Sequence, residues 1–143
     1  MQHVDPGLSH IPMDHGDVLA DIMSASDGTP IVVVNLLKFR ERALYPSDAP
    51  EHALGLSGRD AYQRYADASL EILAERGGAV LLQGTAPRYL VGQGDWDAVW
   101  INRYPGKQAY AETISDPRLP EILRHRAAGL DHQHAFITRP IES

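Results

Sequence analysis

The stretch Pro30-Ile31-Val32-Val33-Val34-Asn35-Leu36-Leu37-Lys38-Phe39-Arg40 decides how this chain folds. Its β-branched and large apolar residues, opened by a proline, are typical of a β-strand. Because side chains alternate along a strand, one side carries Ile31, Val33, Asn35, Leu37 and Phe39, and the other carries Val32, Val34, Leu36, Lys38 and Arg40. Both sides are mostly apolar, so neither can face water along most of its length. Helices of the same chain can cover one side, and we expect a second copy of the protein to cover the other.

Length and composition indicate one globular domain. The chain has 143 residues, of which 43% are hydrophobic and 22% are charged, and its formal net charge is -6. A negatively charged chain lacks the positive field that non-specific nucleic-acid binding requires. The net charge does not exclude a local basic pocket. The absence of cysteine excludes disulfides, thiolate metal sites and cysteine nucleophiles.

The N-terminal segment 1–12 lacks the basic and apolar regions of a secretory signal. No apolar stretch approaches the roughly 20 residues that span a bilayer. We therefore expect a cytoplasmic protein that has neither a membrane nor a nucleic acid as a partner.

The periodicity of apolar residues predicts a regular succession of helices and strands. Expected helices cover 14–25, 57–76, 107–115 and a segment that begins at Asp116-Pro117 and closes at Gly129. Expected strands cover 30–40, 79–91 with an interruption near Pro87, 96–104 after a hairpin turn at 92–95, and 133–139. Without the first helix, the order is strand, helix, strand, strand, helix, strand, which predicts an α+β, ferredoxin-like fold.

This fold has a four-stranded antiparallel sheet that carries its helices on one face. We expect residues 1–29 to form an N-terminal arm with a short helix, and residues 30–143 to form a single ferredoxin-like domain. The other face of the sheet would be bare, and here it is too apolar to stay bare. Pairing two such sheets about a twofold axis covers both faces and predicts a homodimer. The polar connection over 40–57 is long enough to be either functional or a surface excursion.

Several segments resemble those of one known family. They are Val34–Arg40, Ser57–Tyr65, Gly94–Asp97, Tyr104-Pro105, Asp116-Pro117 and His125–Leu130. Over about residues 17–139, and in the same order, the chain resembles the family catalogued as domain of unknown function 1330. The resemblance implies a dimeric α/β barrel, in which two ferredoxin-like protomers join their sheets. The sequence departs from the family pattern at Leu119, where the family often has an aromatic residue. This difference would change the shape of the pocket beneath the helix that follows Asp116-Pro117.

The resemblance supplies no catalytic residues, because the function of that family is not established. Relatives in the same superfamily include cofactor-independent monooxygenases, lactone isomerases, polyketide cyclases and haem-degrading or haem-peroxidase enzymes. A shared fold does not transfer a reaction, so each candidate residue is judged on its own chemistry. In such folds the ligand cleft lies between the helices and the helix-facing side of the sheet.

Asn35, Lys38 and Arg40 are the polar residues of the first strand. In one interpretation, Asn35 hydrogen-bonds a neighbouring strand while the two cations extend to the rim of the sheet. In the other, the three residues orient an anionic or carbonyl-bearing ligand. The sequence leaves both interpretations open.

A second group combines His125 and Arg126 with Tyr62 and Tyr65. A histidine that titrates near neutral pH and an arginine beside a developing oxyanion suit proton abstraction next to a carbonyl. Adjacent helical residues diverge by about 100°, so His125 and Arg126 need not share a pocket. An ion pair between Arg126 and a carboxylate is the structural alternative.

Further candidate ligand contacts are Trp96, Trp100 and Arg103. The two tryptophans suit the wall of an aromatic pocket, and they suit a core or an interface equally well.

His132 and His134 lie two residues apart, with Asp131 beside them, and would share one face of a strand. Alternating histidines can bind a metal ion, but a site needs three or four convergent ligands. A third ligand would have to come from a distant residue such as His125 or His3, so we expect no metal.

The leading hypothesis is a homodimeric small-molecule-binding protein without a bound cofactor. If it is an enzyme, we expect a cofactor-independent acid/base catalyst of the isomerase, cyclase or monooxygenase type that acts on a small carbonyl or aromatic substrate. Its catalytic candidates are His125, Arg126, Asn35 and Tyr65, and its substrate-binding candidates are Lys38, Arg40, Tyr62, Trp96, Trp100 and Arg103. The alternative is a non-catalytic ligand-binding or accessory dimer. Haem binding, a third hypothesis, requires an unobstructed histidine that faces a large cavity.

Overall fold

The stretch 30–40 contains a strand, as predicted, and this strand lies between two others in the sheet. The computed structural model describes residues 10–25 and 28–141. A four-stranded sheet has the order β2-β3-β1-β4, with β1 (Ile31–Phe39) between β3 (Ala98–Tyr104) and β4 (Leu130–Thr138), and with β2 (Ala79–Thr85) at one edge. Neighbouring strands are antiparallel.

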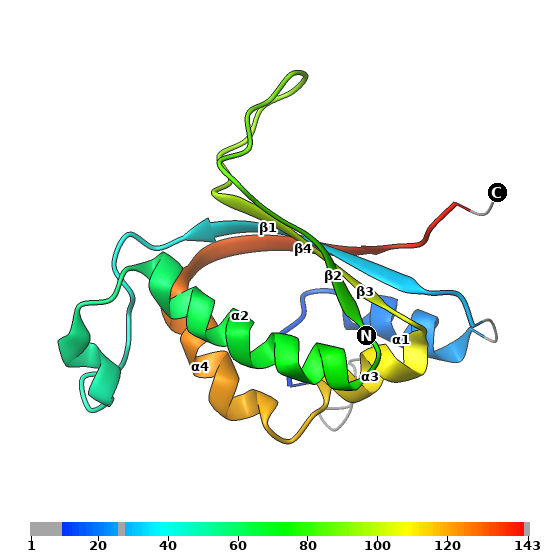
Figure 1. Cartoon of the computed structure of the whole chain (residues 1–143), viewed down its shortest axis with the longest axis horizontal. Helices are drawn as coiled ribbons and strands as arrows, with labels where there is room; N and C mark the ends of the chain where they lie inside the picture. Colours follow the sequence, from blue (N-terminus) through cyan, green and yellow to red (C-terminus); the bar gives the residue numbers. More distant parts are fainter. Residues whose placement is uncertain (1–9, 26–27, 142–143) are drawn as a thin grey trace.

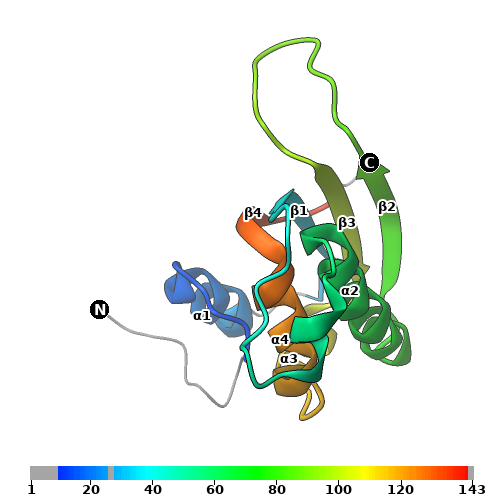
Figure 2. The ribbon, with the colours of Figure 1, turned by 90° about the vertical axis from the view of Figure 1, so that its left-hand side faces the viewer.

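The α-helices of the described chain lie on one side of this sheet (Figures 1 and 2). They are α1 (Gly16–Ser24), α2 (Gly58–Glu75), α3 (Lys107–Ile114) and α4 (Leu119–Gly129), and a short 3-10 helix covers Pro50–Leu54. The predicted α+β, ferredoxin-like fold is therefore confirmed. No helix in the described residues is both long enough and apolar enough to cross a membrane.

Helix α2 begins where the sequence predicts. The Ser57 hydroxyl accepts a hydrogen bond from the backbone N–H of Asp60 at 3.0 Å, which satisfies one of the unpaired amides of the first turn. Gly77 follows the helix with φ 82°, a left-handed conformation that favours glycine. The side chains that α2 buries against the sheet and α4 include Ala61, Tyr62, Ala66, Ile72 and Leu73.

The start of α2 and the end of α4 cross in direct backbone contact. A Cβ atom on Gly58 would lie 2.0 Å from the carbonyl oxygen of Arg40, and one on Gly129 would lie 2.4 Å from the carbonyl oxygen of Gly58. The amide of Arg40 also donates to the Gly129 carbonyl at 2.8 Å. This crossing fixes α4 beside α2 and therefore sets the position of the residues at its C-terminal end.

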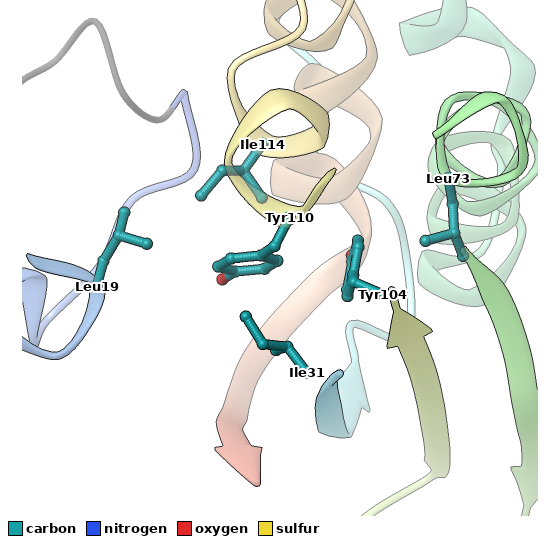
Figure 3. Close-up of a cluster of buried hydrophobic side chains, with 6 residues drawn as sticks. All are labelled: Leu19, Ile31, Leu73, Tyr104, Tyr110 and Ile114. Atoms are coloured by element: carbon teal, nitrogen blue, oxygen red, sulfur yellow. The ribbon is translucent and has the colours of Figure 1, made fainter. Parts of the chain in front are cut away.

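The helix-facing side of β1 is its odd-numbered side. Ile31 is 1% exposed and Leu37 is fully buried. Figure 3 shows one core cluster, in which Ile31 meets residues of α1, α2, α3 and β3: Leu19, Leu73, Tyr104, Tyr110 and Ile114. A second cluster surrounds Leu37 and consists of Tyr62, Ala66, Ala98, Trp100 and Leu130.

On the opposite side of the sheet the described residues place no helix, and we call this side the open face. Val34 lies between Ile101 of β3 and Phe136 of β4, and Leu36 lies between Val99 and His134. Phe136 is 50% exposed. As predicted, one apolar face of the sheet is left uncovered by the part of the chain that the structure describes (Figure 1).

Two sequence predictions about the β2–β3 connection are wrong. Residues 88–91 are not a strand, and the pairing of β2 with β3 ends at Thr85 and Ala98 rather than at a tight turn over 92–95. Pro87 has no N–H to donate to a ladder, and Ala86 has φ 50°, so the strand cannot continue past this point.

The boundaries of the last two elements also differ from prediction. Helix α4 begins at Leu119 rather than at Asp116-Pro117, because the Asp116 carboxylate accepts the amide of Arg118 at 2.9 Å and closes a turn before the helix. Strand β4 begins at Leu130, directly after Gly129, instead of at residue 133.

The 40–57 connection packs against α2 and α4 at one end of the helical layer rather than over the sheet (Figure 1). Tyr45 is buried in a small cluster with Ala61 and Ala128, and the amide of Leu44 donates to the Ala128 carbonyl at 2.9 Å. The predicted first helix corresponds to α1, whose Leu19 belongs to the core. The expected turn at residues 26–27 and the first nine residues of the leading segment lie outside the described residues.

Candidate functional site

Two of the predicted site residues, Arg126 and Asn35, are joined on the helix-facing side of the sheet by a third residue, Gln133. Arg126, near the end of α4, donates a hydrogen bond from its guanidinium to the Oε1 atom of Gln133. The Gln133 side-chain amide donates to Oδ1 of Asn35 at 2.9 Å, and the Asn35 amide donates to the carbonyl oxygen of Trp100 at 3.2 Å. Arg126, Gln133 and Asn35 thus form one hydrogen-bonded row across α4, β4 and β1, which we call the Arg126 row.

Aromatic side chains stand beside the Arg126 row. The ring of Tyr62 lies 5.3 Å from that of Trp100 and 5.2 Å from that of Tyr65, centroid to centroid. Burial raises the pKa of Tyr65, and the nearby positive charge of Arg126 only partly opposes this. Burial also raises the pKa of Tyr62. Both phenols are therefore protonated at neutral pH, where they can donate hydrogen bonds but cannot act as bases.

Arg126 has an unusual charge environment for its helix. Arg124, two residues earlier, pairs with Glu51 at 2.7 Å and with Glu121 at 2.6 Å. Within the described part of the chain, no carboxylate forms an ion pair with Arg126, whose hydrogen-bond partner is the neutral Gln133. The structural alternative from the sequence analysis, an ion pair between Arg126 and a carboxylate, is therefore not formed among the described residues. A half-buried cation without a counter-charge attracts an anion.

The edge of the sheet gives access to the Arg126 row. Ala135 lies opposite Asn35 in the β1–β4 ladder, so the two residues share the helix-facing side. Ala135 is nevertheless exposed, and Gln133 and Arg126 are half-buried. The helical layer therefore leaves this part of β4 uncovered, and the row can be reached from solvent.

A small cavity lies farther along the same side of the sheet. Its volume is about 40 Å³, and it is bordered by Tyr65, Ser69, Asn102, Tyr104 and Thr113 among mostly apolar neighbours. The Oδ1 atom of Asn102 is buried and has no hydrogen-bond partner among the described residues. The cavity is large enough for a few water molecules but far smaller than the roughly 300–1,000 Å³ of a usual ligand pocket. No histidine of the described residues borders this cavity, so it lacks the axial ligand that the haem hypothesis requires.

His125 does not join Arg126. It points to the outside of the helical layer, where its Nδ1 atom lies 2.6 Å from the Tyr45 hydroxyl. Burial lowers the pKa of His125, and the neighbouring Arg124 lowers it further. Glu51 lies in the same place, where the hydrogen bond from Arg124 lowers its pKa to about 2. These contacts fasten the 40–57 connection to α4.

The remaining candidates are scattered. Lys38 lies on the open face between Asp95 at 3.2 Å and Asp97 at 3.4 Å. Arg103 lies opposite Val32, so it belongs to the other end of the open face. The Nε atom of Arg40 is buried and lacks a hydrogen-bond partner in the described residues.

Trp96 and Trp100 lie on opposite faces of the sheet. The ring of Trp96 stacks against His132 at 5.1 Å and His134 at 4.8 Å on the open face, whereas Trp100 is part of the helix-side core. Nδ1 of His132 lies 2.6 Å from a carboxylate oxygen of Asp131. Across residues 10–25 and 28–141, no three metal-ligating side chains converge, and His3 lies outside these ranges.

Sequence reasoning missed Gln133, which joins Arg126 to Asn35. The sequence did contain an indication of its role. Gln133, Ala135 and Ile137 are spaced two apart and therefore lie on one side of the strand, and Gln133 is the polar residue among them. It also missed Tyr45 and Glu51. Their partners lie on α4, and nothing in the local sequence indicates those contacts.

Comparison with solved structures identifies a protein of the same size and fold. The protein RPA0582 of Rhodopseudomonas palustris, a protein of unknown function, is 29% identical, with a TM-score of 0.76 over 100% of both chains. The methylated RPA0582 protein is 30% identical, with a TM-score of 0.77 over 94% of this chain and 97% of that chain.

A more distant similarity concerns the fold alone. A dabb family protein with a ferredoxin-like fold from Mesorhizobium loti is 14% identical, with a TM-score of 0.51 over 80% of this chain and 99% of that chain. No curated protein matches the sequence. The sequence profile described as Domain of unknown function (DUF1330) matches residues 53–139, which is more than half of the chain. The chain therefore belongs to the DUF1330 family.

Proposed function

We propose that this protein binds a small molecule through an anionic oxygen group, a carboxylate above all, at the Arg126 row, and that it does so as a homodimer. The observation that carries the proposal is the half-buried Arg126 guanidinium, which has a neutral amide partner and no carboxylate partner among the described residues. The donor geometry of arginine, the neighbouring side chains and the open face support this assignment.

The donor geometry of arginine suits such a ligand. A guanidinium has five N–H groups in a planar fork, and the bond to Gln133 uses one of them. A carboxylate accepts two parallel hydrogen bonds from such a fork, and these charge-assisted bonds are about twice as strong as neutral ones. The bond from Gln133 to Asn35 holds the amide in one orientation, so the guanidinium is positioned before a ligand arrives.

The neighbouring side chains favour binding over acid/base catalysis. Tyr62 and Tyr65 have raised pKa values and stay protonated at neutral pH. His125, the one base among the catalytic candidates, points away from the row toward Tyr45. Arg126 and Asn35 can orient a ligand and stabilise negative charge on it, but neither accepts a proton. The non-catalytic alternative is therefore the better supported of the two hypotheses.

The open face supports the homodimer. Val32, Val34 and Leu36 line its centre, and Phe136 is 50% exposed beside them. A contiguous apolar surface of this kind is typical of an interface. An isologous twofold dimer would cover it on both copies at once.

Binding can be tested by isothermal titration calorimetry with benzoate and with inorganic phosphate, using wild type, Arg126→Gln and Arg124→Gln. Arg124→Gln is the matched control, because it removes the same charge from the same helix on its outer side. We expect wild type and Arg124→Gln to bind at least one probe, and Arg126→Gln to bind it about tenfold or more weakly. Equal affinities in all three proteins, or no binding of either probe by wild type, would overturn the proposal.

A further inference from the structure

The connection between β2 and β3, residues 86–97, extends away from the body of the protomer, and we call it the extension. The two strands stop pairing at Thr85 and Ala98, and one more backbone bond, from Ala86 to Asp97 at 2.9 Å, closes the ladder. Beyond it the extension rises from the sheet on the side opposite the helices (Figures 1 and 2). It therefore stands on the same side as the open face.

Contacts with the open face hold the base of the extension. The Lys38 ammonium lies between the carboxylates of Asp95 and Asp97, and the other oxygen of Asp97 accepts the amide of Phe39 at 2.9 Å. Trp96 reaches across β1 to stack on His132 and His134 of β4. The direction in which the extension leaves the sheet is thus fixed by side chains from β1 and β4.

The tip of the extension is apolar, and no described residue covers it. Leu90 is 100% exposed and Val91 is 91% exposed. Tyr89 packs back along the extension, since a Cβ atom on Gly94 would lie 2.3 Å from its hydroxyl oxygen. A braced loop that presents adjacent large aliphatic side chains to water is a liability unless a partner covers it.

We infer that the extension is a clasp for a second copy of this chain: when two copies pack through their open faces, the tip of each extension lies against the other copy. This inference rests on the proposed homodimer and adds a second contact to it. Leu90 and Val91 are buried on the partner, and Trp96 with its histidines becomes part of the interface at the base.

The length of the extension determines where its tip reaches. Two packed sheets lie about 10 Å apart. Residues 86 to 91 span at most about 18 Å when extended, at roughly 3.3–3.6 Å per residue. The tip can therefore reach past the plane of the partner's sheet, to the edge or the helical layer of the partner.

A second copy is the occupant that covers the open face and the apolar tip of the extension together. Each copy offers one open face and one clasp on the same side, and a twofold axis pairs face with face and clasp with body. A different partner would cover one open face and one tip, and it would need two complementary surfaces of its own.

The first experiment measures dimer dissociation by analytical ultracentrifugation of the full chain. Wild type is compared with the double variant Leu90→Asp/Val91→Asp and with the control Leu44→Asp/Leu54→Asp. The control changes leucines that are 61% and 58% exposed on the 40–57 connection, away from the open face. We expect the clasp variant to raise the dimer dissociation constant at least about tenfold and the control to leave it unchanged.

The sedimentation experiment distinguishes a wrong clasp inference from a wrong homodimer proposal. A dimeric wild type whose dissociation constant is unchanged in the clasp variant would overturn the clasp and leave the homodimer. A wild type that sediments as a 15.7 kDa particle at all concentrations would overturn both.

The second experiment locates the tip directly and does not depend on the stability of the variant dimer. Because the sequence has no cysteine, Leu90→Cys can be labelled at a single position with benzophenone maleimide. A mixture of ¹⁴N- and ¹⁵N-labelled protein is then irradiated, and cross-linked peptides are identified by mass spectrometry. We expect mixed-isotope cross-links to β4 or to the helices, whereas links within one isotope only would overturn the inference.

Discussion

Leu36 and Leu37 are neighbours on β1, but they lie on opposite faces of the sheet. Leu37 is fully buried under α2, where Tyr62, Ala66 and Trp100 surround it. Leu36 lies between Val99 and His134 on the open face, and no helix of the described residues covers it. Residues of one chemical type thus lie in two environments: one face of the sheet packs the core of the protomer, and the other is the face that we propose a second copy covers. The predictions below test this division, from the largest expected effect to the smallest.

A methyl group at the helix crossing should have the largest effect. Gly58→Ala places a Cβ atom 2.0 Å from a backbone oxygen, which a side-chain adjustment cannot relieve. We expect it to lower the free energy of unfolding by about 3 kcal/mol or more, measured in urea. Gly84→Ala on the open face is the control, because its nearest neighbour would lie at 3.8 Å, and it should change stability by less than about 1 kcal/mol. Similar losses for both variants would contradict the close crossing.

Leu37→Ala should cost about 2–5 kcal/mol of unfolding free energy, because it leaves a cavity in a fully buried cluster. The matched variant Leu36→Ala should cost much less in dilute protein, and its effect should grow as protein concentration rises and dimers form. Urea unfolding at two protein concentrations separates the two behaviours. An equal, concentration-independent loss for both leucines would mean that the two faces do not differ in this way.

Val34→Glu should separate folding from assembly. Val34 lies at the centre of the open face between Ile101 and Phe136, and a carboxylate there would be buried without a partner in the dimer. We expect size-exclusion chromatography with light scattering to show monomers, while circular dichroism and the affinity for benzoate stay close to those of wild type. Loss of folded structure would show that this face contributes to the stability of a single protomer.

The smallest effect concerns pH on the helical side. The pKa of His125 is lowered by burial and by Arg124, so the unfolded chain binds a proton more readily than the folded one. The resulting stabilisation is present above the ordinary histidine pKa of about 6.5 and is lost as pH falls through the folded value. We expect the melting temperature to drop by roughly a few degrees more between pH 7.5 and 5 in wild type than in His125→Gln. Parallel curves for the two proteins would contradict this assignment.

Much of the fold could be predicted because it depends on local patterns. The alternation in residues 30–40, the helical periodicity of 57–76 and the cap at Ser57 are each contained in one segment. The sequence predictions were wrong where the local pattern is compatible with more than one structure. Residues 88–91 have the composition of a strand, but Pro87 and the backbone at Ala86 remove them from the ladder.

The candidate site was only partly predictable. Arg126, Asn35 and Tyr65 were selected by residue type, and the structure places them near one another. Gln133 joins two of them although it lies 98 positions from Asn35 in the chain. His125 was selected by the same reasoning and lies on the other side of its helix, 80 positions from its partner Tyr45.

The sequence by itself determined the order of the elements and the apolar character of both faces of β1, because periodicity is a property of neighbouring residues. Only the tertiary structure decided which face the helices cover, which side of α4 meets the sheet and where residues 86–97 point. These choices depend on contacts between distant segments, such as the Gly58–Gly129 crossing and the Lys38–Asp97 pair. Such contacts cannot be inferred from the sequence of either segment alone.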